Sequence, residues 1–321
     1  MVKYFKYFKY FFQLIRWQNL LLIFATLYFL RYFIFLPYFN KTGFLIIFSN
    51  NSFFLLSIAT LFIAAGGNII NDYFDQKIDF INKPHKVIIG KIFQRRIALL
   101  FHSFFSFAGI IIGSYVSFKN KLPFHSFIFI LSTGLLWFYS TTYKYQFFIG
   151  NLIISLLTSF ITILPIVFDF PLISRIYGSL LDSMGFNINK ITLFFLGFFF
   201  CSLFLNLARE IIKDIIDIKG DKVFKCKTLP IIIGIKKTKF ISIIFIILSI
   251  ISFIFFFYTT FKKTIILIYS LLLIFLPCIF IIIEIFKANQ NKDFRFISNV
   301  IKLILISGLL IAIPIRFLYL N

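Results

Sequence analysis

Nine long apolar runs are the feature that most constrains how this chain can fold. A helix needs about 20 apolar residues to cross a bilayer, and helices satisfy their backbone polar groups within one segment, as lipid requires. Of the 321 residues, 60% are hydrophobic and 14% charged, which excludes an ordinary soluble globular chain. We therefore predict an all-α polytopic membrane protein, a bundle of nine transmembrane helices. The expected spans lie near 17–36, 43–70, 97–118, 122–138, 147–168, 191–212, 240–258, 265–286 and 300–318.

The first twelve residues form a separate pattern. Lys3, Lys6 and Lys9 recur among aromatic residues, which is typical of an amphipathic helix at a membrane interface. A signal peptide is the alternative, but the apolar run that follows is long enough to span and lacks a suitable cleavage site. We predict a single membrane domain over residues 1–321, with 1–12 as an interfacial segment. The 169–190 segment is expected to be a longer outer loop.

The basic residues are distributed unequally between the two predicted faces. The net charge is +22, and 24 of the 33 Lys and Arg residues fall on the face that holds the N-terminus and the loop after the second span. The positive-inside rule makes this face cytoplasmic. The charge is thus explained by topology in the inner (cell) membrane, and we expect no nucleic-acid partner.

Two short acidic windows stand out against this basic, apolar background. They hold seven of the chain's 11 carboxylates, and carboxylates close to lipid are costly, so a cluster indicates a functional site. The alternative is a pair of solvated helix ends that bind local lysines. The windows follow spans 2 and 6, so an even number of spans separates them and both lie on one face. The residues are Asp72, Asp75 and Asp79 in the first window, and Glu210, Asp214, Asp217 and Asp221 in the second.

Both windows have the same helical spacing. Positions 68, 72, 75 and 79 lie along one stripe of a helix, and 210, 214, 217 and 221 repeat the increments. Oxygen ligands without Cys or His favour Mg²⁺, which commonly bridges carboxylates to substrate phosphates. Nearby cations can neutralise the remaining phosphate oxygens; they are Lys77, Lys83, Lys86, Lys144, Arg209 and Lys213.

This arrangement suits the ionisation of an allylic diphosphate. A metal ion with Lys and Arg can stabilise the charge that grows on the leaving diphosphate. The allylic cation needs a water-poor cavity rich in π-systems, and a bundle lined with Phe and Tyr offers one. Glu284, in the middle of the eighth span, is expected either to pair with a basic residue in the bundle or to line the cavity.

At this level the sequence resembles the UbiA superfamily of intramembrane prenyltransferases. The residues that carry the resemblance are Asn71-Asp72-x-x-Asp75-x-x-x-Asp79, Asp214-x-x-Asp217-x-x-x-Asp221, Arg16-x-x-Asn19, Lys83-Pro84, Gly90, Tyr139-Ser140, Lys144 and Gly150-Asn151. The resemblance implies a nine-helix bundle, Mg²⁺ at both motifs and a cavity open to the bilayer. Lys83 replaces the Arg usual in the family and loses its bidentate fork.

The resemblance also implies roles for individual residues. Metal ligands would be Asn68, Asp72, Asp75, Asp79, Asp214, Asp217 and Asp221, with the catalytic work on Asp72, Asp75, Asp214 and Asp217 and on Tyr139 near the reacting carbon. Diphosphate contacts would be Lys144 and Arg209, and the substrate-binding set would extend to Arg16, Asn19, Lys83, Lys86 and Lys213.

Within the family, the second window is most similar to the geranylgeranylglycerol-phosphate geranylgeranyltransferase branch, although Ile216 replaces a usual acidic residue. That similarity implies Mg-dependent transfer of a prenyl group from a polyprenyl diphosphate to a prenyl glycerol phosphate. An aromatic prenyltransferase of quinone biosynthesis is the alternative acceptor class. Two non-enzymatic alternatives are a divalent-cation or phosphate transporter and an isoprenoid-binding protein without catalysis.

Overall fold

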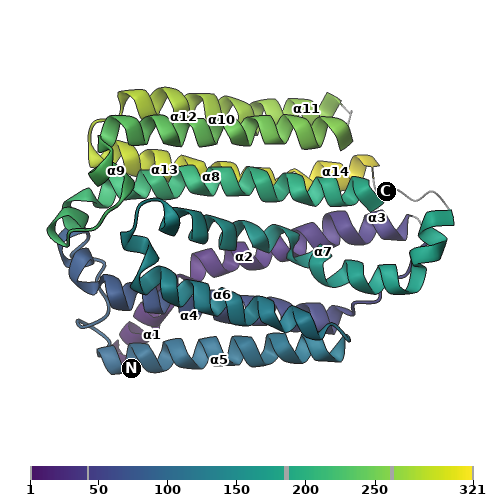
Figure 1. Cartoon of the computed structure of the whole chain (residues 1–321), viewed down its shortest axis with the longest axis horizontal. Helices are drawn as coiled ribbons and strands as arrows, with labels where there is room; N and C mark the ends of the chain where they lie inside the picture. Colours follow the sequence, from purple (N-terminus) through teal and green to yellow (C-terminus); the bar gives the residue numbers. More distant parts are fainter. Residues whose placement is uncertain (1, 42, 184–187, 261–263, 320–321) are drawn as a thin grey trace. The chain divides into compact units, whose positions relative to one another are not determined.

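The computed structural model of this chain is almost entirely helical (Figure 1). It describes residues 2–41, 43–183, 188–260 and 264–319. Within these ranges no β-strand occurs, and nine helical segments are long and apolar enough to cross a membrane. The prediction of an all-α, nine-span protein is therefore confirmed. The spans are Trp17–Asn40, Asn50–Asn82, Arg95–Lys119, Pro123–Thr141, Ile149–Gly178, Ile191–Val223, Gly234–Phe257, Thr264–Lys287 and Asn291–Leu318.

The helical elements follow the apolar runs of the sequence. Two of them, α4 and α8, continue beyond the apolar runs, so both acidic windows are helical. The helices are α1 (Val2–Leu14), α2 (Trp17–Phe29), α3 (Leu36–Asn40), α4 (Asn50–Asn82), α5 (Arg95–Lys119), α6 (Ser126–Thr141), α7 (Ile149–Ser183), α8 (Ile188–Val223), α9 (Leu229–Ile232), α10 (Gly234–Thr260), α11 (Thr264–Ser270), α12 (Leu276–Lys287), α13 (Asn291–Leu310) and α14 (Ala312–Tyr319). Shorter elements are the π-helices η1 (Leu30–Phe35) and η4 (Leu271–Phe275) and the 3-10 helices η2 (Pro123–His125) and η3 (Tyr143–Tyr145).

The chain divides into two compact units. The first unit comprises Met1–Ala25, Phe48–Ile153 and Lys219–Lys227. The second unit comprises Thr26–Ile47, Ile154–Ile218 and Thr228–Asn321. The prediction of a single domain over 1–321 with an interfacial segment stays a prediction, although α1 does form a helix from residue 2.

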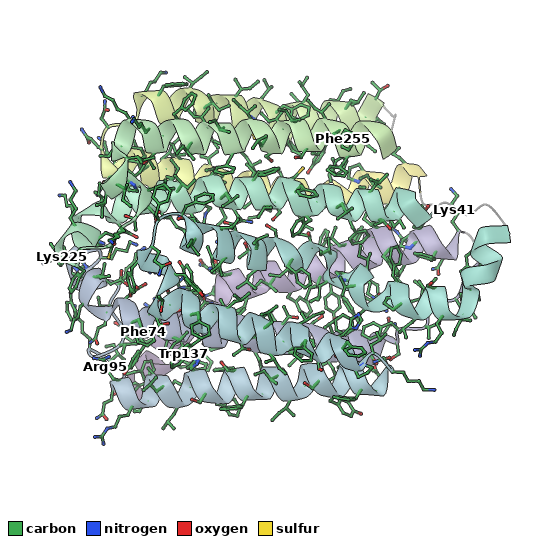
Figure 2. The ribbon with its side chains drawn as sticks, viewed as in Figure 1. Lys41, Phe74, Arg95, Trp137, Lys225 and Phe255 are labelled. Atoms are coloured by element: carbon green, nitrogen blue, oxygen red, sulfur yellow. The ribbon has the colours of Figure 1, made fainter. Side chains whose placement is uncertain are left out.

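In the first unit, α4 packs mainly against α5 and α6 (Figure 1). Gly66 allows the close approach, because a Cβ there would lie 2.7 Å from the Ser106 Oγ. His102 of α5 reaches the Gly66 carbonyl with its Nδ1 at 3.0 Å. Farther along α4, the rings of Phe74 and Trp137 lie beside each other at 5.9 Å between centroids (Figure 2). These contacts hold the end of α4, with its acidic window, against α6.

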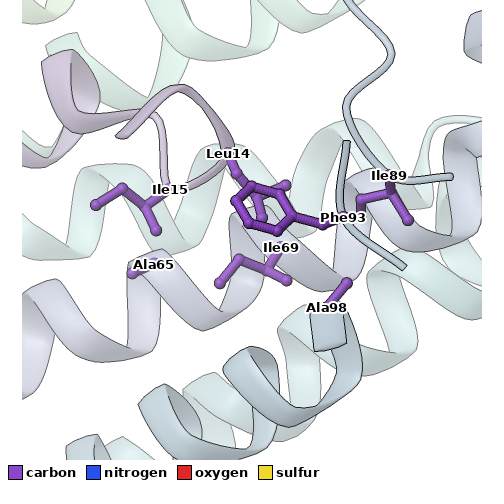
Figure 3. Close-up of a cluster of buried hydrophobic side chains, with 7 residues drawn as sticks. All are labelled: Leu14, Ile15, Ala65, Ile69, Ile89, Phe93 and Ala98. Carbon is purple, nitrogen blue, oxygen red and sulfur yellow. The ribbon is translucent and has the colours of Figure 1, made fainter. Parts of the chain in front are cut away.

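A cluster of buried apolar side chains attaches the turn between α1 and α2 to α4 (Figure 3). The end of α1 contributes one residue, the turn after it one, α4 two, the segment before α5 two, and α5 one. Burying such side chains contributes roughly 1.5–3 kcal/mol each for the larger ones. The turn that carries Arg16 is thereby fixed beside the acidic window. The cluster residues are Leu14, Ile15, Ala65, Ile69, Ile89, Phe93 and Ala98.

In the second unit, α8 and α13 run antiparallel and are joined at two levels. The Asn291 side-chain amide donates to the Ile216 carbonyl at 3.3 Å. The Arg209 Nε donates to the Ser298 carbonyl at 3.4 Å. Both contacts are seven residues apart along each helix (216 minus 209, and 298 minus 291), which is about two helical turns. The two contacts therefore show that Asn291 and Ser298 lie on the side of α13 that faces α8.

Two π-helical turns in the second unit each precede a proline. The Leu36 N–H donates to the Arg31 carbonyl just before Pro37, and the Leu276 N–H donates to the Leu271 carbonyl just before Pro277. Proline cannot donate the next helical hydrogen bond, and a π-turn is one way in which a membrane helix absorbs that loss.

The expectation of an outer loop over 169–190 was wrong for its first part. Helix α7 continues to Ser183, and residues 184–187 lie outside the described residues. The reason is a buried ion pair in the second unit, because Asp169 lies 3.4 Å from the Arg31 Nη1 and both side chains are fully buried. Leu172 and Ile173 are buried one turn farther on. A buried partner and apolar side chains thus keep this stretch helical.

Glu284 pairs with a basic residue, but at the exposed end of its helix and not within the bundle as one of the two expectations had it. Its carboxylate lies 3.6 Å from the Lys287 Nζ, one turn later on α12. The pair is at the end of the helix and is largely exposed on the lysine side, 69% against 31%. We therefore interpret Glu284 as a partner of Lys287 at the helix terminus.

Candidate active site

The first acidic window occupies the last turns of α4. The helix ends where the Lys83 N–H donates to the Asp79 carbonyl at 2.8 Å, and Lys83 leaves the helical conformation. Pro84 follows, and the residue before a proline is disfavoured in the helical region. The sequence thus stops α4 one turn after Asp79, so that the stripe of carboxylates reaches the end of the helix.

Asp75 is the buried carboxylate of this window, with 4% of its surface exposed. It forms an ion pair with the Lys144 Nζ and accepts a long hydrogen bond of 3.5 Å from the Tyr145 hydroxyl. The same Lys144 ammonium donates to the Asn71 Oδ1 at 3.3 Å. Burial lowers the pKa of Lys144, but the charge and hydrogen bond of Asp75 together with the charges of Tyr139 and Asp79 outweigh burial, so the pKa lies well above its ordinary value. Lys144 is therefore a fixed positive charge at the first window.

Asp72 has a different cationic partner. The Arg16 Nη2 donates to the Asp72 Oδ1 at 2.6 Å, and the Asp72 charge raises the pKa of Arg16 above its ordinary value. Arg16 has φ +54°, a conformation that side chains other than glycine seldom adopt. The Asn68 amide donates to the Ile15 carbonyl at 3.0 Å. A hydrogen bond, the ion pair and the apolar cluster together hold this strained turn at the window.

Tyr139 of α6 lies near both ion pairs. Its phenol is close enough to interact electrostatically with Arg16 and with Lys144. It is half-buried, and Ser140 beside it is buried. The structure thus brings the predicted residues Arg16, Tyr139 and Lys144 together with Asp72 and Asp75.

The end of α8, which carries Asp221, the last residue of the second window, belongs to the first unit. Gly220 donates its backbone N–H to the Asn82 Oδ1 at 2.8 Å, which links the last residue of α4 to α8. A Cβ at Gly220 would lie 2.5 Å from the Asn82 Nδ2, so glycine is required for this approach. One residue later, Asp221 is buried, with 8% of its surface exposed.

The segment after α8 lies close to the first window. A backbone hydrogen bond of Lys227 and the thiol of Cys226 mark this proximity. The Lys227 N–H donates to the Tyr145 carbonyl at 2.8 Å, so η3 and this segment are tied together. Cys226 is 5% exposed. Burial, and then the charge of Asp221, raise its pKa to about 11. Lys144 and Asp75 also act on the Cys226 thiol, which places Asp221 in the neighbourhood of the first-window residues.

The remaining second-window residues lie on α8 in the second unit. The Glu210 carboxylate is 2.6 Å from the Lys213 Nζ and 3.5 Å from the Arg209 Nη1. Asp214 and Asp217 follow one and two turns later and are half-buried. The prediction that the two windows face each other stays a prediction.

The donor set of the windows fits Mg²⁺. In the described part of the chain, no three Asp, Glu, His or Cys side chains are gathered closely enough to hold a metal ion. Asp72 and Asp75 are instead each paired with a cationic side chain, so both carboxylates already accommodate positive charge. Mg²⁺ prefers carboxylate oxygens and retains several waters, and the first window offers Asp72, Asp75 and Asp79 along one stripe of α4. The chemistry of the residues present therefore suits this ion.

Three other predicted substrate-binding residues lie farther from the ion pairs of Asp72 and Asp75. Asn19 begins α2, with its N–H donating to the Arg16 carbonyl at 2.8 Å. Lys83 lies near enough to Asp79 to interact with its charge. The Lys86 side chain is exposed, and among the described residues no hydrogen bond or ion pair joins it to a carboxylate. The structure thus places Lys83 at the window and Lys86 at its periphery.

Most of the sequence matches a known protein family. The sequence model of the UbiA prenyltransferase family matches residues 43–306. The chain belongs to the UbiA prenyltransferase family. It is therefore an integral membrane protein of a family of prenyltransferases, as the paired aspartate motifs predict.

Relatives within the UbiA family carry specific names. The digeranylgeranylglyceryl phosphate synthase of Methanosphaera stadtmanae is 35% identical over 261 residues, which cover 80% of this chain and 84% of that protein. The synthase of the same name from Thermococcus sibiricus is 37% identical over 188 residues, which cover 58% of each chain. In the second alignment the chain thus spans a little over half of the relative's length.

Solved structures agree with the UbiA fold. One, from work on digeranylgeranylglyceryl phosphate synthase in membranes, has a TM-score of 0.63 at 24% identity and covers 96% of this chain and 98% of its own. The apo structure of a UbiA homolog from Aeropyrum pernix K1 has a TM-score of 0.64 at 13% identity, over 90% and 97% of the two chains. At these identities the likeness establishes the fold.

Sequence reasoning missed several residues of this UbiA site. Tyr145 contacts Asp75, and Asn82 binds α8; Asn71, quoted above as part of the first motif but given no role there, contacts Lys144. Asn82 could have been found, because it follows Asp79 by three residues and so extends the same helical stripe. Tyr145 gave no such signal, since its role depends on the fold of η3.

Proposed function

We propose that this chain transfers a geranylgeranyl group from geranylgeranyl diphosphate to the free hydroxyl of geranylgeranylglycerol phosphate, with Mg²⁺ as cofactor. The bond between C1 of the prenyl chain and the diphosphate oxygen breaks, and its electron pair leaves with the diphosphate. A new ether bond joins C1 to the hydroxyl oxygen of the acceptor, whose proton passes to a base. The products are a diether lipid phosphate and diphosphate.

The single observation that carries this proposal is the similarity to the synthase of Methanosphaera stadtmanae, 35% identical across 84% of that protein. The name of that relative states its product, digeranylgeranylglyceryl phosphate. The proposal transfers this activity to the present chain, because the aspartates of both motifs, Asp72, Asp75 and Asp79 and Asp214, Asp217 and Asp221, are present here.

The site residues have defined roles in this proposal. Asp72, Asp75 and Asp79 would hold Mg²⁺ at the first window, and Asp214 and Asp217 would do so at the second; the bound ion would stabilise the negative charge on the departing diphosphate. Arg16 forms an ion pair with Asp72, and Lys144 forms one with Asp75. Both cationic side chains would also be available to neutralise diphosphate oxygens. Asn68 and Asp221 would complete the ligand sets, and Tyr139 would lie beside the reacting carbon.

We further propose that both windows lie on the cytoplasmic side. The support is the excess of Lys and Arg on the face that holds them, 24 of 33, since cytoplasmic loops are enriched in these residues. A cysteine placed at exposed Lys86 should react with an impermeant maleimide only after the cytoplasmic face is made accessible. Labelling of intact cells at this position would contradict the orientation.

The activity is tested with purified protein in detergent, Mg²⁺ and radiolabelled geranylgeranyl diphosphate. Geranylgeranylglycerol phosphate and 1,4-dihydroxy-2-naphthoate are offered in parallel reactions. We expect label to enter the glycerol lipid, to stop entering it with EDTA and to enter it again after Mg²⁺ is added back. Label on the naphthoate alone would replace the proposal with an aromatic prenyltransferase of quinone biosynthesis.

The non-enzymatic alternatives have their own readouts. Diphosphate binding without release of pyrophosphate would indicate an isoprenoid-binding protein. Cation-dependent uptake by liposomes that contain the protein, without turnover of the diphosphate, would indicate a transporter.

A further inference from the structure

Two successive residues of η3 contact the buried carboxylate of the first window. Lys144 is the middle residue of this 3-10 turn. Its ammonium pairs with Asp75 and donates to the Asn71 Oδ1 at 3.3 Å. Tyr145, the next residue, donates from its hydroxyl to Asp75 at 3.5 Å. The position of the η3 backbone therefore determines where both donors lie relative to Asp75.

The first turn of α7 lies directly against the backbone of η3. Gly150, the second residue of this helix, is buried. A Cβ at this position would lie 2.8 Å from the Lys144 Cα and 2.8 Å from the Tyr143 carbonyl oxygen. Carbon atoms in ordinary contact are about 3.5–4.0 Å apart. A side chain at position 150 would therefore displace η3, or the start of α7, by about 0.7 Å or more.

Backbone conformation does not explain why position 150 holds a glycine. Gly150 is helical, and the glycines with positive φ in the described part of the chain are Gly43, Gly90 and Gly234. Alanine forms helices better than glycine does. The space that the η3 backbone occupies is thus the physical reason for a glycine here.

Two further features hold η3 in place. Phe148, between η3 and α7, has φ +61°, and residues in such strained conformations persist where the surrounding structure holds them, often at functional sites. The Lys227 N–H donates to the Tyr145 carbonyl at 2.8 Å, which joins η3 to the segment after α8. A displacement of η3 would therefore act on this bond as well as on the two donors to Asp75.

We propose that Gly150 is a positioning residue for the diphosphate site, because it leaves the space in which η3 holds Lys144 and Tyr145 against Asp75. The inference rests on the proposed function, since Lys144 affects binding of the donor only if its ammonium contacts the diphosphate. Misplacing a group by about 1 Å can lower a rate about 100-fold. A displacement of about 0.7 Å is therefore large enough to measure.

A role in packing alone gives a different kinetic result. If Gly150 only allows helix packing, Gly150→Ala reduces the amount of folded enzyme, so that the apparent kcat falls and the KM of each substrate is unchanged. If Gly150 positions Lys144, the KM for the donor rises in the folded protein. The KM for the acceptor is then unaffected.

The test compares wild type with Gly150→Ala and with two matched glycine-to-alanine controls. A Cβ at Gly134 of α6 would have no described atom within 4 Å, so Gly134→Ala should behave like wild type. A Cβ at Gly197 of α8 would lie 2.7 Å from the Phe256 Cβ in the second unit. Gly197→Ala should therefore lower the melting temperature and leave both KM values unchanged.

Each protein is assayed below its own melting temperature in detergent micelles. Initial rates give kcat and the KM values for geranylgeranyl diphosphate and geranylgeranylglycerol phosphate. Inhibition by inorganic diphosphate is measured in parallel, because it reports binding of the diphosphate without the prenyl chain.

For Gly150→Ala we expect the donor KM and the inhibition constant of inorganic diphosphate to rise about tenfold. This is the lower end of the roughly 10–100-fold loss that corresponds to one hydrogen bond to a charged group. The acceptor KM should stay at the wild-type level. A folded Gly150→Ala protein with the wild-type donor KM would overturn the positioning role.

A second variant decides the matter if Gly150→Ala does not fold. Tyr145→Phe removes the hydroxyl that donates to Asp75 and keeps the ring and the backbone of η3. We expect its donor KM to rise about 2–5-fold, because the bond that it removes is long. An unchanged donor KM would then reject the role of η3 and with it that of Gly150.

Failure of the proposed function gives a separate result. A wild-type protein that prenylates no glycerol lipid would overturn the proposed function and this inference together. An active wild type with an unaffected Gly150→Ala variant rejects only the positioning role.

Discussion

The ion pair between Asp75 and Lys144 offers the sharpest test of how the first window is built. Asp75 is 5% exposed at its side chain and Lys144 is 30% exposed. Lys144→Met would leave the buried carboxylate with the Tyr145 hydroxyl, 3.5 Å away. Removing one partner of a buried pair costs about 3–5 kcal/mol, and the partial exposure of Lys144 favours the lower end, about 3 kcal/mol.

A second variant separates charge from packing. Asp75→Asn combined with Lys144→Met removes both charges, so no carboxylate remains buried without its cation. Replacing both members of a buried pair is often close to neutral. The double variant should therefore recover most of the stability that Lys144→Met loses, a coupling that a double-mutant cycle measures directly.

Stability is measured as thermal unfolding in detergent micelles, followed by the loss of the monodisperse peak in size-exclusion chromatography. A loss of about 3 kcal/mol corresponds to a melting temperature lower by roughly 6 °C for a chain of this size. Lys86→Met, at an exposed lysine of the same unit, is the control and should melt like wild type. The reasoning is refuted if Lys144→Met melts at the wild-type temperature, or if the double variant is as unstable as the single one. Prenyl transfer should be lost in both, because both lack Lys144.

Three further predictions concern other parts of the site. Asp72→Asn and Asp214→Asn should each abolish prenyl transfer while the protein stays folded and membrane-inserted, and near-normal turnover in either would disprove shared metal binding. Gly220→Ala should lower the melting temperature, because its Cβ would lie 2.8 Å from the Asn82 Cγ, and adding Asn82→Ala should recover part of the loss; additive losses would show that the two do not touch. Cys226, with its pKa raised to about 11, should react slowly with maleimide at pH 8 in a variant without the other cysteines. Its rate should rise about tenfold per pH unit toward pH 11, whereas a plateau near pH 9 would indicate an ordinary thiol.

The sequence predicted the spans because membrane insertion depends on local composition. A run of about 20 apolar residues forms its own hydrogen bonds wherever it lies in the chain. The helical spacing of the windows is also local, so the stripe of Asp72, Asp75 and Asp79 could be derived from position alone. The expectation failed over 169–183, because helix α7 persists there through the pair of Asp169 with Arg31, a partner remote in sequence.

The candidate site could be predicted only as a list of residues. Sequence patterns indicated that Arg16 and Lys144 serve the acidic windows, but not which carboxylate each one contacts. Arg16 binds Asp72 from 56 residues away, and Lys144 binds Asp75 from 69 residues away. The link from Asn82 to Gly220 spans 138 residues.

The sequence by itself therefore determined the class of the protein, its nine spans and the two carboxylate stripes, because each of these follows from periodicity and hydropathy within one segment. Only the tertiary structure decided which cation neutralises which carboxylate, and that Arg16 is held in a left-handed turn. The physical reason is that an ion pair depends on the packing of helices far apart in the chain. A sequence pattern within one segment does not predict which distant helices pack together.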